Sequence, residues 1–511
     1  MSITITPQDP RYEMLKASRN LRWPTQQANF AGRIEMCESI DDVAATLQRV
    51  VDAGLRPTVR SGGHCYEDFV VNNPGGVILD MSLMPSPRRT GNGASSPYWI
   101  GPGEQLGDIY LDLYKRYGVC IPAGTCYSVG AGGHISGGGY GLLSRLNGLT
   151  CDWLSAVDIV TVDKGGKVVP RRVDAQHDPD LFRACRGAGG GNFGIITGFH
   201  FDKLPQAPRE VVNTGLSFDW STMTEERFAK ILTTYGHFWE TRGKDPDTFG
   251  LFSILTLSHS SSRHLGMGVQ FCNPDGTCSD LSVLHEFLDL FAPCNPAPDA
   301  KIRAGDRTGA SRQPAGETCA SPRPLTRRPW IEAAIGEVGG NESGRAKYKS
   351  AYMRHNFMPE EIKCIYRYLK SDLPGTNLGG FVVAVDSYGG AINQPKLAQE
   401  TAAWQRSSIM KLQFQFYWSN ASEDEARLKW LRTFYAALYS TSAVAPGHAG
   451  TPWPGADYEG CYINYPDGDM LAHPFWPQVY YGTGDLYPFL QDVKRRYDPN
   501  NIFHHAMSVR T

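Results

Sequence analysis

A histidine follows a compact glycine turn near the start of the chain. Arg60 ends a strand-like stretch, and Ser61, Gly62 and Gly63 connect it to His64. Because glycine has no Cβ atom, the backbone amides of such a turn can approach a phosphate group closely. The turn is therefore a candidate phosphate-binding site. The alternative is a structural turn in which His64 is only a hydrogen-bonded turn residue.

A second glycine-dense segment surrounds a single thiol. Eight glycines lie between residues 124 and 141, together with Cys126. Such a backbone, with few side chains in the way, allows close approach to a ligand. Taken alone, the segment is also compatible with a structural loop around a buried thiol.

Residues 189–194 formally match a dinucleotide-binding pattern, G-x-G-x-x-G. A Rossmann fingerprint follows a strand and opens a helix, so that the pyrophosphate lies at the helix N-terminus. Here the pattern precedes the strand-like stretch Ile195–Phe201. We therefore exclude a Rossmann site, while the glycines still allow backbone amides to approach a ligand.

Composition excludes several classes of function. The chain has 511 residues, of which 55 are glycine, and 50 basic against 52 acidic side chains give a net charge of −2. This balance argues against a nucleic-acid or anionic-membrane binder, which needs a concentrated basic face. No segment approaches the roughly 18 apolar residues of a membrane span. The first residues lack the basic and apolar regions of a signal peptide, so we expect a cytoplasmic protein.

The twelve cysteines are an ordinary density for this length. No C-x-x-C pair is present, so we expect no metal site. Cys272 and Cys278 flank a turn-forming segment, where they either form a disulfide or remain thiols.

The elements that position these residues are of mixed type. In the first 200 residues, Ser39 is a plausible N-cap for a helix whose apolar stripe includes Val43 and Leu47. Val157–Val162 is strand-like, and a glycine turn leads from it to Val168. Short strands and helices in this arrangement predict an α+β fold.

The pattern changes near residue 206. The stretches 251–257 and 381–385 predict strands of an antiparallel sheet, and 225–241 and 423–440 predict helices packed against it. Residues 273–330 are rich in Pro, Gly, Arg and Ser, which predicts a long surface excursion.

At the glycine segments the chain resembles the berberine-bridge-enzyme-like branch of the vanillyl-alcohol oxidase superfamily, whose members carry a PCMH-type FAD-binding domain. The resemblance extends along the whole chain, through the segments 60–64, 126–141, 180–194, 386–391, 462–467, 480–482 and 497–503. One departure follows Gly482, where Thr483 stands in place of the asparagine that is common in the family.

This resemblance implies the domain organisation. Residues 1–205 are expected to form the FAD-binding domain, which the tail 466–511 completes. Residues 206–465 are expected to form a substrate domain, an antiparallel sheet backed by helices that covers the isoalloxazine ring. The residue pattern itself predicts that the last 30 residues return to a helix, with Leu490 and Val493 on one side.

The resemblance also implies two covalent bonds to the flavin. In its bicovalent members a histidine matching His64 is bonded to the 8α-carbon, and a cysteine matching Cys126 to carbon 6. The amides of Ser61, Gly62 and Gly63 are expected to hold the pyrophosphate. The other expected cofactor-binding residues are Arg60, Gly130, Gly133, Gly138, Asn192, Ile196 and Asn464.

Tyrosine serves as the base in related sugar and natural-product oxidases, which makes Tyr462 the expected base here. It lies two residues before Asn464, so in a strand both side chains project to one face. Because an ordinary tyrosine titrates near pH 10, its neighbours must stabilise the phenolate. Tyr388 and Tyr140 are further candidates for the active site, and Tyr465 is the alternative base if the register differs.

The expected reaction is that of an oxidase. An alcohol or hemiacetal carbon gives hydride to flavin N5, and dioxygen is reduced to hydrogen peroxide. A cytoplasmic natural product or its sugar unit is the favoured substrate, as in antibiotic biosynthesis. The alternatives are a hexose or oligosaccharide oxidase, an amine oxidase or berberine-bridge-type cyclase, and a flavin-free carbohydrate-binding protein. We expect a small-molecule substrate and O2 as partners, no nucleic acid or membrane, and a monomer or homodimer.

Overall fold

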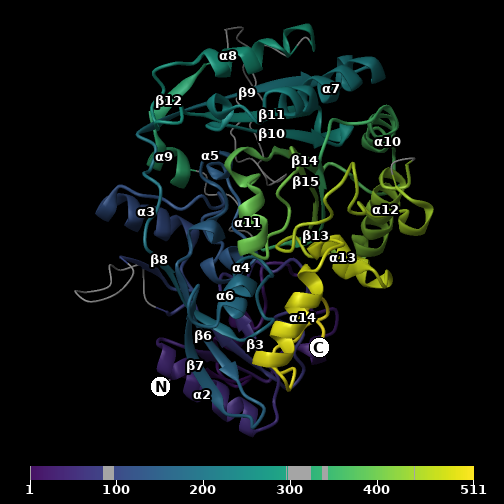
Figure 1. The fold of residues 1–511 in the computed structure, drawn as a ribbon. Helices are drawn as coiled ribbons and strands as arrows, with labels where there is room; N and C mark the ends of the chain where they lie inside the picture. Colours follow the sequence, from purple (N-terminus) through teal and green to yellow (C-terminus); the bar gives the residue numbers. More distant parts are fainter. Residues whose placement is uncertain (1, 85–96, 295, 297–323, 337–342, 442–443) are drawn as a thin grey trace.

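The structure is a computed structural model that describes residues 2–84, 97–294, 296, 324–336, 343–441 and 444–511. In this part of the chain the strands form two four-stranded sheets and one seven-stranded sheet. The two small sheets take their strands from before residue 202, and the large sheet takes its strands from 210–418. The structure thus has the α+β class that the residue pattern predicts (Figure 1).

One strand of the first small sheet leads directly into the turn that contains His64. Its order is β1(Ile3–Ile5), β2(Arg33–Met36), β4(Val77–Asp80) and β3(Pro57–Arg60). Strands β2 and β3 are both parallel to β4. The chain therefore leaves β3 at the carboxyl edge of a parallel pair, the edge at which open α/β sheets commonly bind ligands.

The second small sheet is antiparallel, in the order β5(Tyr98–Ile100), β8(Ile195–Phe201), β6(Ala156–Val162) and β7(Val168–Asp174). Helix α2(Ile40–Asp52) lies between the two small sheets, because its Val43, Leu47 and Val50 share one apolar core with β4 and β6. The side chain of Ser39 accepts a hydrogen bond from the amide of Asp42 and caps this helix, as the sequence predicts.

The large sheet is antiparallel in every pairing that the structure describes. Its order is β12(Thr326–Pro329), β9(Glu210–Asp219), β11(His264–Phe271), β10(Leu251–Ser258), β14(Phe381–Ser387), β15(Met410–Trp418) and β13(Arg345–Met353). Helices α7(Glu225–Thr241), α10(Pro359–Leu369) and α12(Asp424–Leu438) pack beside it (Figure 1). The hydroxyl of Tyr235 in α7 donates to the carbonyl of Val385 in β14 at 2.8 Å, which ties this helix layer to the sheet.

The end of the chain returns to the first half. Helix α14(Leu486–Tyr497) buries Leu490 and Val493 as predicted and contacts α6(Pro179–Cys185) (Figure 1). The Nζ of Lys494 donates to the carbonyl of Asn192 at 2.7 Å, and the amide of Val509 donates to its side-chain oxygen at 2.8 Å. The remaining α-helices are α1(Tyr12–Leu15), α3(Leu106–Tyr117), α4(Ala131–Ser136), α5(Ser144–Asn147), α8(Ser282–Asp289), α9(Trp330–Ile335), α11(Pro395–Glu400) and α13(Trp476–Tyr481).

The prediction of one surface excursion over 273–330 is wrong for the parts that the structure describes. Helix α8 buries Leu284 and Phe287 against α7, and β12 extends the large sheet by pairing with β9. The overall Pro, Gly, Arg and Ser content masked the short apolar stripe of α8, and an edge strand needs only its backbone to pair. Residues 295 and 297–323 lie outside the described residues.

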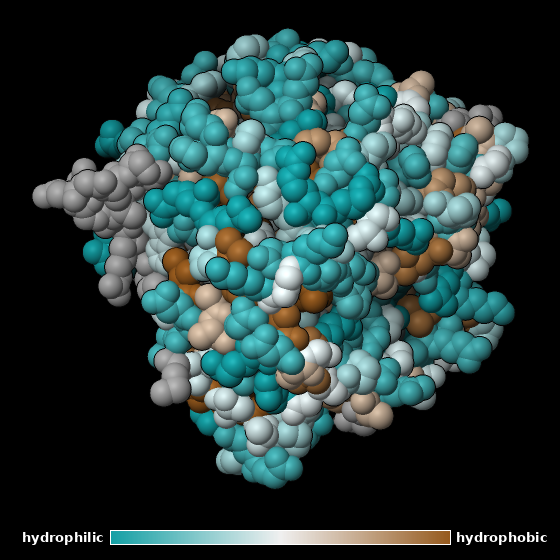
Figure 2. All heavy atoms as spheres, turned by 60° about the horizontal axis from the view of Figure 1, so that its bottom comes forward, coloured by the Kyte–Doolittle hydropathy of each residue, from teal (hydrophilic) through white to brown (hydrophobic). Residues whose placement is uncertain are grey.

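Cys272 and Cys278 are both free thiols. No described helix is long and apolar enough to cross a bilayer. The face in Figure 2 is mainly hydrophilic, and its hydrophobic side chains gather in several small, separate patches.

Candidate active site

A cavity of about 580 Å³ is lined by residues from both halves of the chain. It draws its wall from the β3 turn, the Cys126 segment, the loop 189–196, the start of β13 and the segments 462–466 and 503–505. Among the predicted residues, those that line it are Arg60, Ser61, Gly62, Gly63, His64, Cys126, Gly130, Gly133, Tyr140, Asn192, Ile196, Tyr462, Asn464 and Tyr465. Gly138 and Tyr388 are absent from the lining.

The two glycine segments are packed directly against each other. A Cβ atom on Gly62 would overlap the amide nitrogen of Gly130, and one on Gly130 would overlap the hydroxyl of Ser61. Gly63 has φ of +72°, a backbone conformation that favours glycine. The structure therefore requires glycine at these positions for the two loops to meet, whatever they bind.

His64 and Cys126 open onto this one cavity. The Nε2 of His64 lies 2.9 Å from the hydroxyl of Ser128, which is two residues from Cys126. Burial lowers the pKa of His64 to about 3, with a further contribution from the charge of Arg19. The imidazole is therefore neutral near pH 7 and keeps a nitrogen lone pair that can act as a nucleophile.

The lining also fits a long cofactor that approaches the backbone. A Cβ atom on Gly133 or Gly190 would meet no atom within 4 Å, so the cavity wall leaves open space at both glycines. Gly189 and Gly191 have φ of +89° and +74°, so the loop that precedes β8 adopts backbone conformations that favour glycine. These glycines form a cradle that side chains would fill, which is the geometry a dinucleotide needs.

Tyr462 and Asn464 do interact, but not through a strand. Residues 462–465 form a turn, in which the amide of Tyr465 donates to the carbonyl of Tyr462 at 2.9 Å. The prediction of a strand at 462–464 was wrong, because the backbone bonds to itself within this turn and not to a neighbouring strand. The turn nevertheless places the Asn464 amide 3.2 Å from the Tyr462 hydroxyl, and the amide of Gly139 donates to the same oxygen at 3.3 Å.

The surroundings of Tyr462 act on its pKa in opposite directions. Burial raises the pKa of Tyr462 above that of an exposed tyrosine, as does negative charge on Tyr465. The hydrogen bonds from Asn464 and from the amide of Gly139 lower it. A phenolate at this position therefore depends on those two donors.

A lysine that sequence analysis did not identify lies among these tyrosines. Lys411 of β15 pairs with Asp386 of β14 at 2.9 Å, and neither side chain has any exposed surface. Its Nζ donates to the hydroxyl of Tyr465 at 3.2 Å, and it lies 3.8 Å from the ring centroid of Tyr140 and 5.6 Å from that of Tyr462. The alternation of polar residues along 411–417 was its only signal in the sequence.

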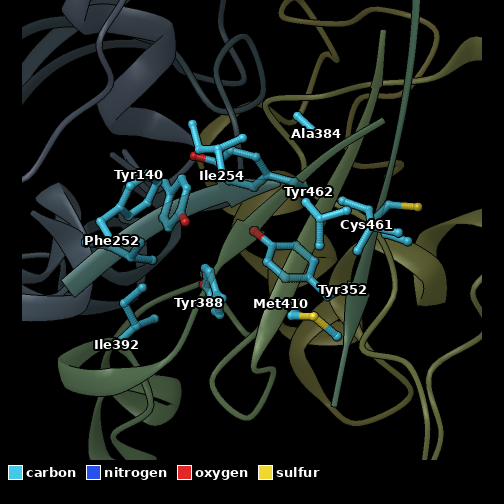
Figure 3. Packing of buried hydrophobic residues seen from close by; sticks show 14 of the residues in the cluster. Tyr140, Phe252, Ile254, Tyr352, Ala384, Tyr388, Ile392, Met410, Cys461 and Tyr462 are labelled. Atoms are coloured by element: carbon cyan, nitrogen blue, oxygen red, sulfur yellow. The ribbon is translucent and has the colours of Figure 1, made fainter. Parts of the chain in front are cut away.

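Tyr388 lies behind the cavity wall. Its hydroxyl donates to the carbonyl of Gln405 at 3.0 Å, and its ring lies 5.4 Å from that of Tyr140 and 5.0 Å from that of Tyr352. Figure 3 shows these rings with Tyr462 in one buried cluster. Tyr388 thus supports the wall, and its predicted part in catalysis stays a prediction.

Two further tyrosines extend the wall beyond the predicted residues. Tyr66 stacks on Tyr348 of β13 with 3.5 Å between ring centroids, and its hydroxyl accepts a hydrogen bond from Gln413 at 2.8 Å. No motif identified Tyr66, Tyr348 or Gln413 in advance.

Gly138, which does not line the cavity, has φ of +118°, and a Cβ atom there would lie 3.8 Å from the Tyr462 hydroxyl.

Two family models match the chain. Residues 33–169 match the model for an FAD binding domain, and residues 461–510 match the model described as berberine and berberine like. These ranges contain His64, Cys126, Tyr140, Tyr462 and Asn464.

Relatives of similar length support the same assignment. The aclacinomycin-N/aclacinomycin-A oxidase of Streptomyces galilaeus is 32% identical, over 94% of this chain and 86% of its own length. The hexose oxidase of Chondrus crispus is 32% identical, over 98% of this chain and 94% of its own length. The crystal structure of GilR, an oxidoreductase that catalyses the terminal step of gilvocarcin biosynthesis, has a TM-score of 0.86 at 29% identity and full coverage of both chains. The chain therefore belongs to the berberine-bridge-enzyme-like family of FAD-linked oxidases, and it is related to antibiotic-tailoring and sugar oxidases.

Proposed function

We propose that the protein oxidises an alcohol or hemiacetal carbon of a natural product or of its sugar unit, with FAD attached through both His64 and Cys126. The observation that carries this proposal is that both attachment residues and the buried Tyr462 line the same cavity. FAD, when bound there, supplies hydride acceptance at N5 and transfers the electrons to dioxygen, which yields hydrogen peroxide.

The residues that would hold FAD are those of the glycine cradle. The amides of Ser61, Gly62 and Gly63 face the pyrophosphate in this proposal, and the loop around Asn192 faces another part of the cofactor. Each covalent bond joins a side-chain atom, a ring nitrogen of His64 or the Sγ of Cys126, to a flavin carbon. Each partner loses one hydrogen, and dioxygen takes up both hydrogens as hydrogen peroxide.

Tyr462 is the proposed base. Its phenolate oxygen accepts the proton of the substrate hydroxyl, while the two N–H donors from Asn464 and Gly139 hold the oxygen in place. Lys411 adds positive charge 5.6 Å from the Tyr462 ring centroid. Because Tyr462 is only 5% exposed, little water screens these interactions.

Tyr465 is the alternative base, since Lys411 donates directly to its hydroxyl. A carboxylate base, as amine oxidation or ring closure would favour, has less support. Asp386, a buried carboxylate beside these tyrosines, is already paired with Lys411 at 2.9 Å.

Relatives favour a natural-product substrate or a sugar unit. The S. galilaeus relative is an aclacinomycin oxidase and the C. crispus relative is a hexose oxidase, so both substrate classes are represented. A peroxide assay with hydroxylated natural products, glycosylated natural products and free hexoses separates them. Turnover of free sugars alone would overturn the natural-product assignment.

The attachment is tested on acid-precipitated protein. Yellow colour should remain in the pellet of the unchanged protein, His64→Ala and Cys126→Ala should each retain one bond, and the double variant should release the flavin. Release of free flavin from the unchanged protein would overturn covalent attachment. A colourless protein would instead favour the carbohydrate-binding alternative.

A further inference from the structure

The cavity joins the two small sheets to the large sheet. On the side of the large sheet it is lined by Tyr348 of β13 and Tyr417 of β15. Tyr66, two residues after His64, stacks on Tyr348 there. On the side of the small sheets the lining consists of Pro57–Val59 of β3, Ile159 of β6, Ile195 of β8 and Phe503–His505 of the tail.

FAD in this cavity would occupy both sides. The proposed attachment at His64 assigns the isoalloxazine ring to the side of the large sheet, because Tyr66 stacks on Tyr348 there. The ADP half of the dinucleotide then lies among the small sheets and the tail. The rings of Phe69 and His505, which both line the cavity, stack there with 4.2 Å between their centroids.

Two irregular segments meet on this side of the cavity, the loop 189–194 and the tail segment 503–505. Neither contains a helix or a strand. A Cβ atom on Gly191 would lie 3.4 Å from the Cδ2 of His505, so the two segments are in contact. Because no sheet or helix bonds hold these segments, their positions depend on the side chains that bind their backbone.

Lys494 of α14 binds the backbone of both segments. Its Nζ donates to the carbonyl of Asn192 at 2.7 Å and to the carbonyl of Phe503. It also donates to the Oδ2 of Asp498 at 2.6 Å, and neither side chain of this pair has any exposed surface. An ammonium group has three N–H donors, so each of them has a partner here.

Asp498 holds the tail from the other side of the pair. Its Oδ1 accepts from the amide of Ile502 at 2.8 Å, and its Oδ2 accepts from the amide of Phe503 at 2.9 Å. A buried ion pair adds little net stability over apolar residues of similar size. What the contacts of this pair do fix is the position of the two segments relative to each other.

We propose that Lys494 and Asp498 are positioning residues that hold the loop 189–194 and the tail segment 503–505 in place for the ADP half of FAD. The inference rests on the proposed function, specifically on FAD in this cavity, and it requires neither covalent bond. Segments that are held in place before binding lose less conformational freedom when the cofactor binds. The pair therefore favours the affinity for FAD.

The test measures affinity on the full-length chain that carries His64→Ala and Cys126→Ala, so that no covalent bond disturbs the equilibrium. Titration calorimetry gives the Kd of two probes, FAD and riboflavin, of which riboflavin lacks the ADP half. Lys494→Met combined with Asp498→Asn removes both buried charges at once. This pair variant should raise the Kd of FAD about tenfold and leave the Kd of riboflavin unchanged.

Arg427→Met combined with Glu423→Gln is the matched control. It removes another pair with a spacing of four residues, at the start of α12 and outside the cavity lining, and should change neither Kd. Asp498→Asn alone keeps a side-chain oxygen and should raise the Kd of FAD less than the pair variant does. If the pair variant shows no cooperative thermal unfolding, Asp498→Asn alone decides, and an unchanged Kd of FAD for it overturns the inference.

Two results overturn the inference while the proposed function stands. One is an unchanged Kd of FAD in a folded pair variant. The other is equal weakening of FAD and riboflavin, which a general loss of structure would produce.

The protein that keeps His64 and Cys126 gives an independent measurement. Flavin-free pair variant should need about tenfold more FAD than the otherwise unchanged chain for half-maximal loading, and excess FAD should restore full loading. An equal requirement for FAD would contradict the inference. If the unchanged protein takes up no FAD at all, the proposed function fails and the inference fails with it.

Discussion

Lys411 and Asp386 form a fully buried ion pair, 2.9 Å from Nζ to Oδ2, on adjacent strands of the large sheet. Lys411 also lies 3.8 Å from the ring centroid of Tyr140 and donates to the hydroxyl of Tyr465. The pair therefore fixes a positive charge among the tyrosines of the cavity wall. Buried pairs add little net stability over apolar residues, but removal of one partner leaves an uncompensated charge.

Lys411→Met should destabilise the protein by about 3–5 kcal/mol, because it leaves Asp386 buried without its cation. Lys411→Met combined with Asp386→Leu should recover most of that loss and still show a reduced kcat. Chemical denaturation measures the stability, and peroxide release measures kcat. A double variant with full activity would show that the pair is purely structural.

Tyr462→Phe should lower kcat by about 10²–10⁴, the usual contribution of a general base. Covalent flavin should be retained, since Tyr462 does not take part in attachment. Tyr366→Phe removes the hydroxyl of a tyrosine outside the cavity, which donates to the carbonyl of Met223 at 3.3 Å, and should leave kcat unchanged. If Tyr465→Phe gives the larger loss instead, Tyr465 is the base.

Asn464→Ala should move the pH–rate profile to higher pH. Asn464 donates to the Tyr462 hydroxyl and lowers its pKa, so loss of this donor raises the pKa. The base acts as phenolate, and the rising limb of kcat/KM should therefore shift upward. Asn393→Ala removes an amide that donates to the carbonyl of Ser408 outside the cavity and serves as the control. If the rising limb of kcat/KM does not shift, Asn464 does not act on the pKa of the base.

Gly133→Ala should impair flavin binding without unfolding the chain. A Cβ atom at Gly133 meets no protein atom within 4 Å, but it projects into the space that we assign to the cofactor. Crowding of this kind costs about 1–3 kcal/mol. Flavin content per protein, read from absorbance, should fall, whereas Gly447→Ala, with equally open surroundings outside the cavity lining, should load normally.

The sequence was most informative where the backbone itself forms the site. The segments around Gly62 and Gly130 could be predicted because glycine is required wherever two loops or a ligand approach the backbone. Lys411 could not, since its importance comes from the pairing of β14 with β15, which joins residues far apart in the chain. Helix α8 was not predicted, because its apolar stripe is short and polar segments surround it in the sequence.

The lining of the cavity also makes flavin binding depend on segments from opposite parts of the sequence. The cavity uses Arg60 and Ser61 near the start of the chain and Phe503 to His505 near its end. A chain cut before residue 503 therefore lacks one wall of the cavity. Such a truncated chain should hold flavin more weakly than the chain with these residues.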